Sequence, residues 1–545
     1  MHAAKFCKDD RESCDFDRAI DLTGNGKFHY ELKLVCCLSS LSVGFQNGLS
    51  SYIFGPARCE LGITSGELGL LNVAFLVGGI GSCFVWGILA DNRGRKKILI
   101  FTHLLNAVIN VLCSIVPYKN VLTLCRFFSG FLIGAPGTLT YTYIVEFHQQ
   151  RKQFRNVCLC GIFFVLSWLL LPILAYAILP LEFSYNAKNV VALSPWRLFL
   201  LVLTAPDVLV GFWLMRLPES PKFWLAKGQQ KKALAILQRM YAANKGVPRD
   251  GFPVKHIVGE GGANVKGNEI MVTGKTLRVL KELLQQIQKL FQKPLVIKTG
   301  LTTGLMFSNM FGLFGLGIWL PELFIKFNQY QSLHPNSTVT VKELSTLNLE
   351  RNQTCEHSID QNVVINTVAT GSCALIFNII CCLLASKVSS KRITLVLSFV
   401  GGLSAGSIYW LQTATQNLIV ACIFQSTTLT ANLTATSVVV EAFPASVGGI
   451  AICLAVCVGR FGAVFSSAAF AYFMDNHCEI PIFMVAFFGV LASLLCMMLP
   501  NQEKRVECDR GELEQRHFGF FTRKQSYEIA TISHKIVDSN CIYRQ

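Results

Sequence analysis

The sequence predicts an all-α membrane protein with twelve transmembrane helices in two similar halves. The 545-residue chain is 52% hydrophobic and only 15% charged, whereas a soluble protein carries about 25% charged residues. Its apolar residues recur as separate runs of about 20 residues, the length that crosses a bilayer as a helix. Two landmarks in the first half of the chain also recur at matching separations in the second half.

The strongest local signal is the connector Gly87-Ile-Leu-Ala-Asp91-Asn-Arg-Gly94-Arg95-Lys96-Lys97, which joins two apolar runs. Its four basic residues place this turn in the cytoplasm by the positive-inside rule. We expect Gly87 to let two helices approach closely and Gly94 to form a turn with positive φ. We expect Asp91 to interact with free N–H groups where the next helix begins. The alternative is a basic turn such as any membrane protein needs.

Polar segments divide the chain into five parts. We expect a cytoplasmic tail (1–30), a six-helix half (31–216), a cytoplasmic central loop (217–298), a second six-helix half (299–499) and a cytoplasmic tail (500–545). Twelve spans leave both termini on one side, which the basic loops make cytoplasmic. The predicted spans are 31–54, 67–90, 98–117, 121–145, 157–180, 197–216, 299–326, 363–386, 393–413, 417–440, 449–474 and 480–499.

The polar parts contain amphipathic segments. In the N-terminal tail, apolar residues at helical spacing predict a short helix lying on the cytoplasmic membrane surface. In the central loop we expect helices over Phe223–Ala243 and Leu277–Phe291, with a flexible loop over 246–275 between them. The residues that share one face of the N-terminal helix are Phe16, Ala19, Ile20 and Thr23.

Internal repetition supports the two halves. The fourth span ends with Glu146-Phe147 and the tenth with Glu441-Ala-Phe-Pro444. Glu146 follows Asp91 by 55 positions, and Glu441 follows Lys387, in the connector after the eighth span, by 54. Matching separations predict parallel halves related by an axis along the membrane normal.

The loop 327–362 is predicted to lie outside and holds two glycosylation patterns, at Asn336 and Asn352. Most of the 21 cysteines fall inside apolar spans, where they act as small hydrophobic residues. Cys59, Cys355 and Cys478 fall in predicted outer loops, and which two of them form a disulfide stays open. No metal-ligand spacing occurs, so we expect neither a metal nor a cofactor.

Charge and motifs exclude other classes of function. The net charge of +16 is concentrated in loops of one side, as membrane topology requires, which argues against nucleic acid as a partner. No phosphate-binding loop and no nucleophile–base pair occurs, so we do not expect an enzyme. We expect a monomer that contacts the lipid bilayer.

Further segments add to the connector and the glutamate landmarks. They are Ala19-Ile-Asp-Leu-Thr-Gly-Asn-Gly-Lys-Phe28, Pro56-Ala-Arg-Cys-Glu-Leu61 and Pro218-Glu-Ser-Pro-Lys222. Together these residues resemble the synaptic vesicle glycoprotein 2 branch of the major facilitator superfamily. The resemblance implies the major facilitator fold, with two pseudo-symmetric six-helix halves. It also implies secondary active transport of a small polar or charged organic solute by alternating access, with a proton or cation as candidate co-substrate.

Several departures from that family leave alternatives open. Here the loop between spans 7 and 8 is about 35 residues long, without the large domain of the better-known members. Phe45-Gln46-Asn47 stands where relatives have acidic residues, and Gly448 and Gln153 replace arginines. One alternative is a transport-inactive binding or trafficking protein that keeps the fold; a second is an organic cation or anion carrier. The plasma membrane and an intracellular vesicle membrane both fit.

The resemblance also implies a conformational gate. In the family, a cytoplasmic cluster of ion pairs latches the two halves and holds the inner gate shut in the outward-facing state. The alternative is that these charges only orient the chain. The matching residues are Asp91, Arg95, Glu146, Arg151, Arg155, Glu219, Glu441 and Arg460.

Ionisable side chains inside spans are candidates for substrate or ion binding because burying them in a bilayer is costly. Arg126, four residues before Gly130, is expected to hold an anionic substrate, to respond to a protonation site or to serve as a structural pin. Asp207 is a candidate proton or cation site. Helix–helix hydrogen bonds explain intramembrane amides equally well. The remaining candidates for the cavity wall are Gln46, Asn47, Trp168, Asn309, Trp319 and Asn432.

Overall fold

The computed structural model describes residues 13–63, 65–116, 118–181, 185–187, 191–258, 285, 287–333, 361–384, 388–443, 445–473 and 479–500. Every structural statement below concerns these residues. The described residues up to Met498 form one compact unit. The predicted helix Leu277–Phe291, the glycosylation sites Asn336 and Asn352, and the tail 501–545 lie wholly or largely outside the described residues.

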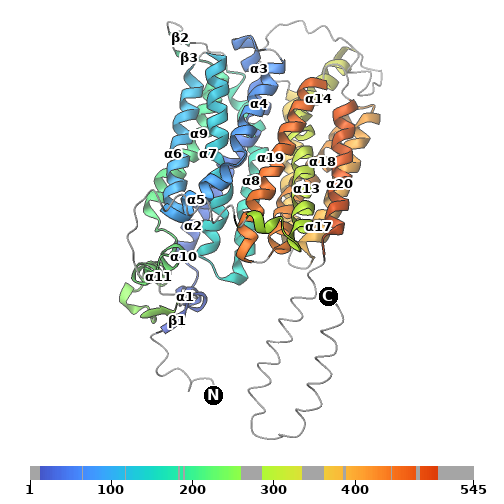
Figure 1. The fold of residues 1–545 in the computed structure, drawn as a ribbon. Coiled ribbons are helices and arrows are strands. Elements are labelled where there is room, and N and C mark those ends of the chain that lie inside the picture. Colours follow the sequence, from blue (N-terminus) through green and yellow to red (C-terminus); the bar gives the residue numbers. More distant parts are fainter. Residues whose placement is uncertain are drawn as a thin grey trace, which may run out of the picture. The chain divides into compact units, whose positions relative to one another are not determined.

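The protein is a bundle of long helices (Figure 1), as predicted. Eleven of them are long and apolar enough to cross a membrane by length and composition, and α2 completes the predicted twelve spans. The N-terminal half contains α2 (Lys27–Gly48), α3 (Ser50–Leu61), α4 (Ser65–Gly79), α5 (Ser82–Arg93), α6 (Arg95–Ile115), α7 (Lys119–Glu146), α8 (Gln150–Ile178) and α9 (Pro195–Arg216). The C-terminal half contains α13 (Leu295–Phe314), α14 (Leu316–Leu333), α16 (Gln361–Leu384), α17 (Ser390–Ser407), α18 (Ala414–Ala442), α19 (Ala445–Phe473) and α20 (Glu479–Met498).

The remaining described elements are short. A hairpin of β2 (Tyr185–Ala187) and β3 (Val191–Leu193) lies between α8 and α9. The elements before the first span and after the sixth are β1 (Ser13–Asp15), α1 (Phe16–Thr23), α10 (Pro221–Ala226), α11 (Gln230–Lys245), a 3₁₀ turn (Arg249–Gly251) and β4 (His256–Val258).

Three spans that we predicted as continuous helices are interrupted. The first breaks at Leu49, between α2 and α3, and the second breaks at Ile80 and Gly81, between α4 and α5. Gly81 has φ +70°, a left-handed conformation that ends α4 at little cost only because the residue is glycine. The seventh span breaks at Gly315, where an added Cβ would lie 2.0 Å from Ser466 Oγ. The backbone nevertheless stays hydrogen-bonded at the first and third breaks: the N–H group of Leu49 donates to Phe45 O at 2.9 Å, and that of Gly315 donates to Phe311 O at 3.0 Å.

Glycine lets α4 and α7 touch through their backbones. A Cβ on Gly130 would lie 1.9 Å from the Phe75 carbonyl oxygen, and one on Gly78 would lie 2.0 Å from that of Phe127. This explains why a glycine follows Arg126 by four residues. Our expectation for Gly87 was wrong, since an added Cβ there would meet no atom within 4 Å.

The basic connector between α5 and α6 folds partly as predicted. Gly94 has φ +104°, which confirms the expected turn. Asp91 does not bond to the N–H groups of α6; its Oδ1 lies 3.1 Å from Arg95 Nη2. The N–H group of Lys96 instead donates to Glu219 Oε1 at 3.1 Å. Glu219 reaches this position because Gly94 has no side chain: a Cβ there would lie 2.2 Å from its Oε2.

The repeated landmarks meet in both halves. Arg95 Nη2 lies 3.1 Å from Glu146 Oε1 in the N-terminal half, and Ser390 Oγ donates to Glu441 Oε1 at 2.9 Å in the C-terminal half. Each pair is 51 positions apart in the sequence. The two halves thus place equivalent residues in equivalent contacts.

The N-terminal helix α1 packs on protein rather than on the membrane surface. Its apolar face is buried as predicted, but the partner is α11, with Ala233, Leu237 and Met240 in the same hydrophobic cluster. Strand β1 also pairs in parallel with β4. The predicted contact of this face with the membrane surface is therefore wrong. Apolar side chains of α11, in the central loop, already cover it. Helices α1, α10 and α11 and strand β1 lie together at one end of the bundle (Figure 1).

The central loop differs from the predicted single helix Phe223–Ala243. It forms α10 and α11, separated at Gly228, which has φ +71°. Asn244, in the last turn of α11, ties this segment to the N-terminal tail: its Nδ2 donates to the carbonyl oxygens of Thr23 and Gly24 at 3.1 and 3.2 Å. Its Oδ1 accepts from the N–H group of Phe28 at 3.2 Å.

Two buried histidines stand beside this junction. The rings of His29 and His148 are 4.9 Å apart, and each side chain is only 2% exposed. His29 Nε2 lies 3.2 Å from the Phe147 carbonyl oxygen, and His148 Nδ1 lies 2.7 Å from that of Ile144. Burial lowers the pKa of both rings, that of His148 to about 4, against 6.5 when exposed.

We predict that acid destabilises the protein through His148. The folded pKa lies below the unfolded value, so the unfolded chain binds more protons between pH 6.5 and 4, and stability falls across that window as pH decreases. The contribution at neutral pH is at most about 3 kcal/mol. Thermal unfolding midpoints of the detergent-solubilised protein from pH 7.5 to 4.5 should fall less steeply in His148→Asn than in wild type. His256→Asn, an exposed control, should keep the wild-type slope; equal slopes in all three proteins would contradict the prediction.

Candidate functional site

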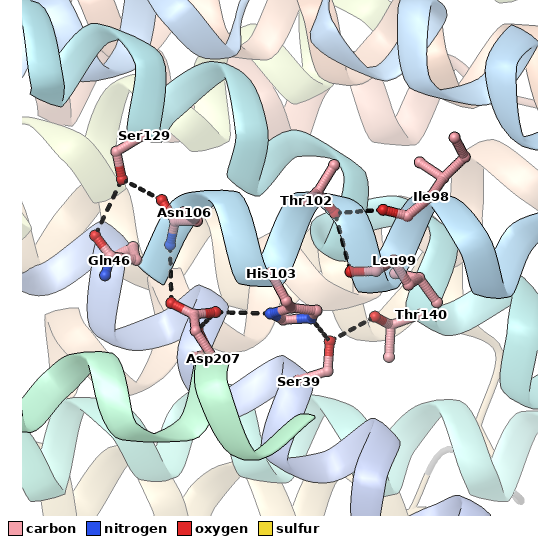
Figure 2. Close-up of polar contacts among 11 residues, drawn as sticks. Ser39, Gln46, Ile98, Leu99, Thr102, His103, Asn106, Ser129, Thr140 and Asp207 are labelled. Atoms are coloured by element: carbon pink, nitrogen blue, oxygen red, sulfur yellow. Dashed lines mark hydrogen bonds and ion pairs between the residues drawn. The ribbon is translucent and has the colours of Figure 1, made fainter. Parts of the chain in front are cut away.

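A buried carboxylate organises the interior of the N-terminal half (Figure 2). Asp207, on α9, is 0% exposed. Its Oδ1 accepts from Ser42 Oγ at 2.5 Å and lies 2.6 Å from His103 Nδ1, and its Oδ2 accepts from Asn106 Nδ2 at 2.8 Å. These partners come from α2 and α6 of the same half. Three donors therefore replace the water that an ionised carboxylate would lose on burial.

His103 gives this group of residues two protonation states. Its Nε2 lies 2.8 Å from Ser39 Oγ, which lies 2.8 Å from Thr140 Oγ1. When the ring is neutral, its Nδ1–H group donates to Asp207 and its Nε2 accepts from the Ser39 hydroxyl. When a second proton binds at Nε2, the ring donates to Ser39, whose hydroxyl then turns toward Thr140. The hydrogen bonds at both ring nitrogens can thus be satisfied with either one or two N–H groups on the ring.

Arg126 occupies a second buried site, beside the break in the first span. It is 1% exposed, and its guanidinium carbon lies 4.4 Å from the centre of the Phe75 ring. Its Nη1 donates to Gln46 Oε1 at 3.3 Å, and its Nη2 donates to Gln46 O at 3.3 Å and Ser50 Oγ at 3.2 Å. These acceptors are all neutral, and Nε has no hydrogen-bond partner among the described residues. The second amide candidate, Asn47, donates to Val43 O at 2.7 Å, within its own helix.

Ser129 lies between the two buried sites and can donate its one hydroxyl proton to an acceptor of either site. Ser129 Oγ lies 3.3 Å from Gln46 Oε1 and 2.8 Å from Asn106 Oδ1. Asn106 in turn contacts Asp207 through its Nδ2. The order along this buried chain is Arg126, Gln46, Ser129, Asn106, Asp207, His103 and Ser39.

Arg460 belongs to the interior and not to the cytoplasmic gate, where we had placed it. It follows the first residue of α19 by fifteen positions, which is about 22 Å along a helix. Its guanidinium group packs over Gly79, where an added Cβ would lie 2.3 Å from Nη1. Arg460 therefore connects the two halves, because α4 belongs to one and α19 to the other.

The rest of the predicted gate is divided between the halves. Both ion pairs of Arg95, to Asp91 and to Glu146, stay within the N-terminal half, and Glu219 contacts the same connector. In this arrangement these residues fasten α5, α6, α7 and the Pro218 turn to one another. The latch between the halves, which belongs to the outward-facing state, stays a prediction. Glu441 is bonded to Ser390 in the other half. Arg155 is exposed, and the side chain of Arg151 is not described.

The other predicted cavity residues have mixed surroundings. Asn309 Oδ1 accepts from Ser398 Oγ at 3.0 Å, and Trp319 stacks on Phe470 with ring centres 6.2 Å apart. Trp168 Nε1 and Asn432 Oδ1 are buried without a hydrogen-bond partner in the described part of the chain. The last two remain candidates for contacting a solute.

Sequence reasoning missed three ionisable residues. His103 lies inside the third predicted span and carried the same signal as Asp207, an ionisable group among apolar residues. Arg197 is 0% exposed, and its Nη2 lies 2.9 Å from Glu60 Oε1. Ser194 Oγ and Trp196 Nε1 also donate to Glu60 Oε2 at 2.6 and 2.5 Å. Burial raises the pKa of Glu60, but these donors and the Arg197 charge outweigh it and lower the pKa below its ordinary value.

Similarity to known proteins indicates the family of this chain. The model of the family described as "Sugar (and other) transporter" matches residues 30–320, more than half of the chain. The chain belongs to this family.

Other members and neighbours agree with this assignment. Synaptic vesicle glycoprotein 2B of Rattus norvegicus is 28% identical over 246 residues, 44% of this chain and 36% of that protein. Synaptic vesicle glycoprotein 2B of Homo sapiens is 25% identical over 322 residues (56% and 47%), and 2A of Homo sapiens is 28% identical over 238 (43% and 32%). The chain thus matches between a third and a half of the length of these relatives.

Solved structures show the fold. The partially occluded, inward-open xylose transporter XylE from E. coli superimposes with a TM-score of 0.60 at 16% identity, covering 87% of this chain and all of that chain (100%). XylE bound to 6-bromo-6-deoxy-D-glucose gives 0.61 at 18% identity, covering 87% and 96%. This member of the sugar (and other) transporter family therefore has the predicted major facilitator fold and is an integral, multi-pass membrane protein.

We predict that Glu60→Gln destabilises this family member because Arg197 would be left buried without its ionic partner. Such a loss costs about 3 kcal/mol, which should lower the thermal unfolding midpoint of the detergent-solubilised protein. Glu67→Gln is the matched control: Glu67 pairs with Lys119 at 2.7 Å, but both side chains are more than a third exposed, so the change should cost about 1 kcal/mol or less. Equal shifts in both variants would contradict the prediction.

Proposed function

We propose that the protein is a secondary active transporter that moves a small organic solute by rocking its two halves around a central site. The observation that carries this proposal is Arg126. Its buried charge has neutral protein acceptors only, and it lies beside the broken first span. Transporters place solute sites near the bilayer midplane, where discontinuous helices expose polar backbone. Family membership and fold support the same function class.

The contacts between the halves suit such a motion. One seam joins α4 and α5 to α19, where Asn72 Nδ2 donates to Ser467 Oγ at 3.0 Å and Cys83 Sγ donates to Cys453 O at 3.4 Å. The other joins α8 to α16, where a Cβ on Gly371 would lie 2.8 Å from the Trp168 carbonyl oxygen. Neutral hydrogen bonds and packing contacts can break at a cost of a few kcal/mol. Binding of a solute can shift a two-state equilibrium by a free energy in the same range.

We infer further that the co-transported ion is a proton bound by His103 and Asp207. The hydrogen bonds of the His103 ring can be satisfied in both protonation states, and the chain of polar contacts leads from Asp207 to Gln46, which accepts from Arg126. A proton added to His103 changes the electrostatic field at Asp207 and hence the hydrogen bond that Asp207 accepts from Asn106. Ser129 can then shift its hydroxyl donation between Asn106 Oδ1 and Gln46 Oε1, which is an acceptor of Arg126. This is a physical route by which a proton in α6 and α9 can influence a solute site at α7.

We predict that Asp207→Asn abolishes uptake driven by a pH gradient. Reconstituted protein would be offered a panel of organic anions, organic cations, sugars and nucleosides, with and without an imposed gradient. In wild type, the imposed pH gradient should raise accumulation at least ten-fold over the level reached without a gradient. The variant should keep only downhill exchange, because the pair of residues can no longer hold its proton. Glu67→Gln should behave like wild type.

Two other outcomes have defined meanings. Uptake that does not change with the pH gradient would contradict proton coupling but would agree with transport. No uptake of any compound by folded protein would favour the alternative of a transport-inactive binding protein.

We also predict that joining Cys83 to Cys453 stops transport. Their thiols are in side-chain contact across a seam, and a second pair, Cys158 and Cys382, touches across the other seam. Copper-catalysed air oxidation would cross-link them, and dithiothreitol should restore uptake. Cys453→Ala combined with Cys382→Ala should resist the inhibition.

The control is a contact within one half. Cys113 and Cys125 touch between α6 and α7 of the N-terminal half, so Cys113→Ala should leave the inhibition unchanged. Full uptake in protein shown by mass spectrometry to be cross-linked at Cys83 and Cys453 would contradict the rocking of the two halves.

A further inference from the structure

Two arginines from opposite halves contact the same side of helix α4. Arg126, on α7, packs on the ring of Phe75, and Arg460, on α19, packs over Gly79. Phe75 and Gly79 are four residues apart and therefore lie on one helix face, about 6 Å apart along the axis. The absence of a side chain at Gly79 is what admits the Arg460 guanidinium group.

The charges of both arginines are poorly balanced by the protein. The acceptors of Arg126 are neutral, and its Nε has no described partner. The Arg460 side chain is partly buried, but its Nη1 is shielded from solvent and likewise has no partner among the described residues. The nearby ionisable groups of Arg460 are the thiols of Cys83 and Cys457, which are neutral when protonated.

Helix ends do not balance this charge. Arg126 lies where α2 ends and α3 begins, and Arg460 lies near the last residue of α4, shortly before α5 begins. The opposite partial charges of one helix end and the next helix start largely cancel at such a break. Two positive charges with no ionised carboxylate beside them among the described residues therefore remain in a region where uncompensated charge is costly.

We propose that the transported solute is an organic anion whose carboxylate or phosphate groups are held by Arg126 from one half and Arg460 from the other. The proposal rests on the proposed transport function and names its substrate class. Guanidinium groups bind such oxyanions through paired N–H donors, and the unpartnered Nε of Arg126 and Nη1 of Arg460 supply donors that the protein leaves free. An anion bound to both arginines joins the halves across the seam, so its binding favours the closed arrangement.

The test is binding of defined probes to the purified full-length protein in detergent, measured as a shift of the thermal unfolding midpoint. The probes are glutarate and glycerol 3-phosphate as anions, 1,5-pentanediol as the neutral analogue and 1,5-diaminopentane as the cationic one. We expect concentration-dependent stabilisation by at least one anion and none by the other two compounds. Arg126→Gln and Arg460→Gln should each weaken the response at least ten-fold. Arg239→Gln, at an exposed arginine of α11, should not.

Three further variants keep the test valid if a glutamine variant does not fold. Arg126→Lys and Arg460→Lys keep the charge and should keep a reduced response. Gly79→Ala removes no charge but displaces the Arg460 guanidinium, and it should weaken the anion response as Arg460→Gln does.

The assignment is overturned if neither anion stabilises the protein, if the diol or the diamine does so instead, or if the response survives loss of either arginine. Failure of this kind is distinguishable from failure of the transport function. Uptake of a sugar or an organic cation by the same preparation would refute the anion and leave the transporter in place.

Discussion

The structure depends on the need to neutralise charge inside an apolar bundle. Asp207 is met by three donors, Arg197 by Glu60, and Arg95 by two carboxylates. Each of these groups holds two or more helices of the N-terminal half together. Arg126 and Arg460 are the described exceptions, and both lie against α4. The bundle thus contains two kinds of buried charge. Some are neutralised within one half, whereas those of Arg126 and Arg460 are the ones that we propose to bind the solute.

Small residues make this separation possible. Gly130 and Gly78 let α4 and α7 touch through their backbones, which brings Arg126 onto Phe75. Gly79 admits Arg460 from the other half, and Gly94 admits Glu219 to the basic connector between α5 and α6. In each case the missing side chain leaves space for a charged group or a carbonyl. The positions of glycine therefore decide where charge can be buried.

Much of this fold could be predicted from apolar runs, basic loops and the repeated landmarks. A helix that crosses a bilayer needs an apolar run of a certain length, and such runs can be read directly from the sequence. The breaks at Leu49, Gly81 and Gly315 could not be predicted, since they depend on contacts such as Gly315 with Ser466. The candidate site was predictable one residue at a time. The sequence marks Arg126 and Asp207 as costly but cannot say that Asn106 and Ser129 connect them. It also could not place Arg460 beside Gly79, because that contact depends on how α19 packs on α4.

The attachment of the N-terminal tail to the central loop has a mechanical consequence. Through β1, β4 and Asn244, the segment before the first span and the segment after the sixth are joined at one end of the bundle. The N-terminal half therefore begins and ends at a shared attachment. Its first and sixth helices cannot separate at that end unless the pairing of β1 with β4 and the Asn244 hydrogen bonds break. A movement of one half against the other would therefore act on the N-terminal half as one unit.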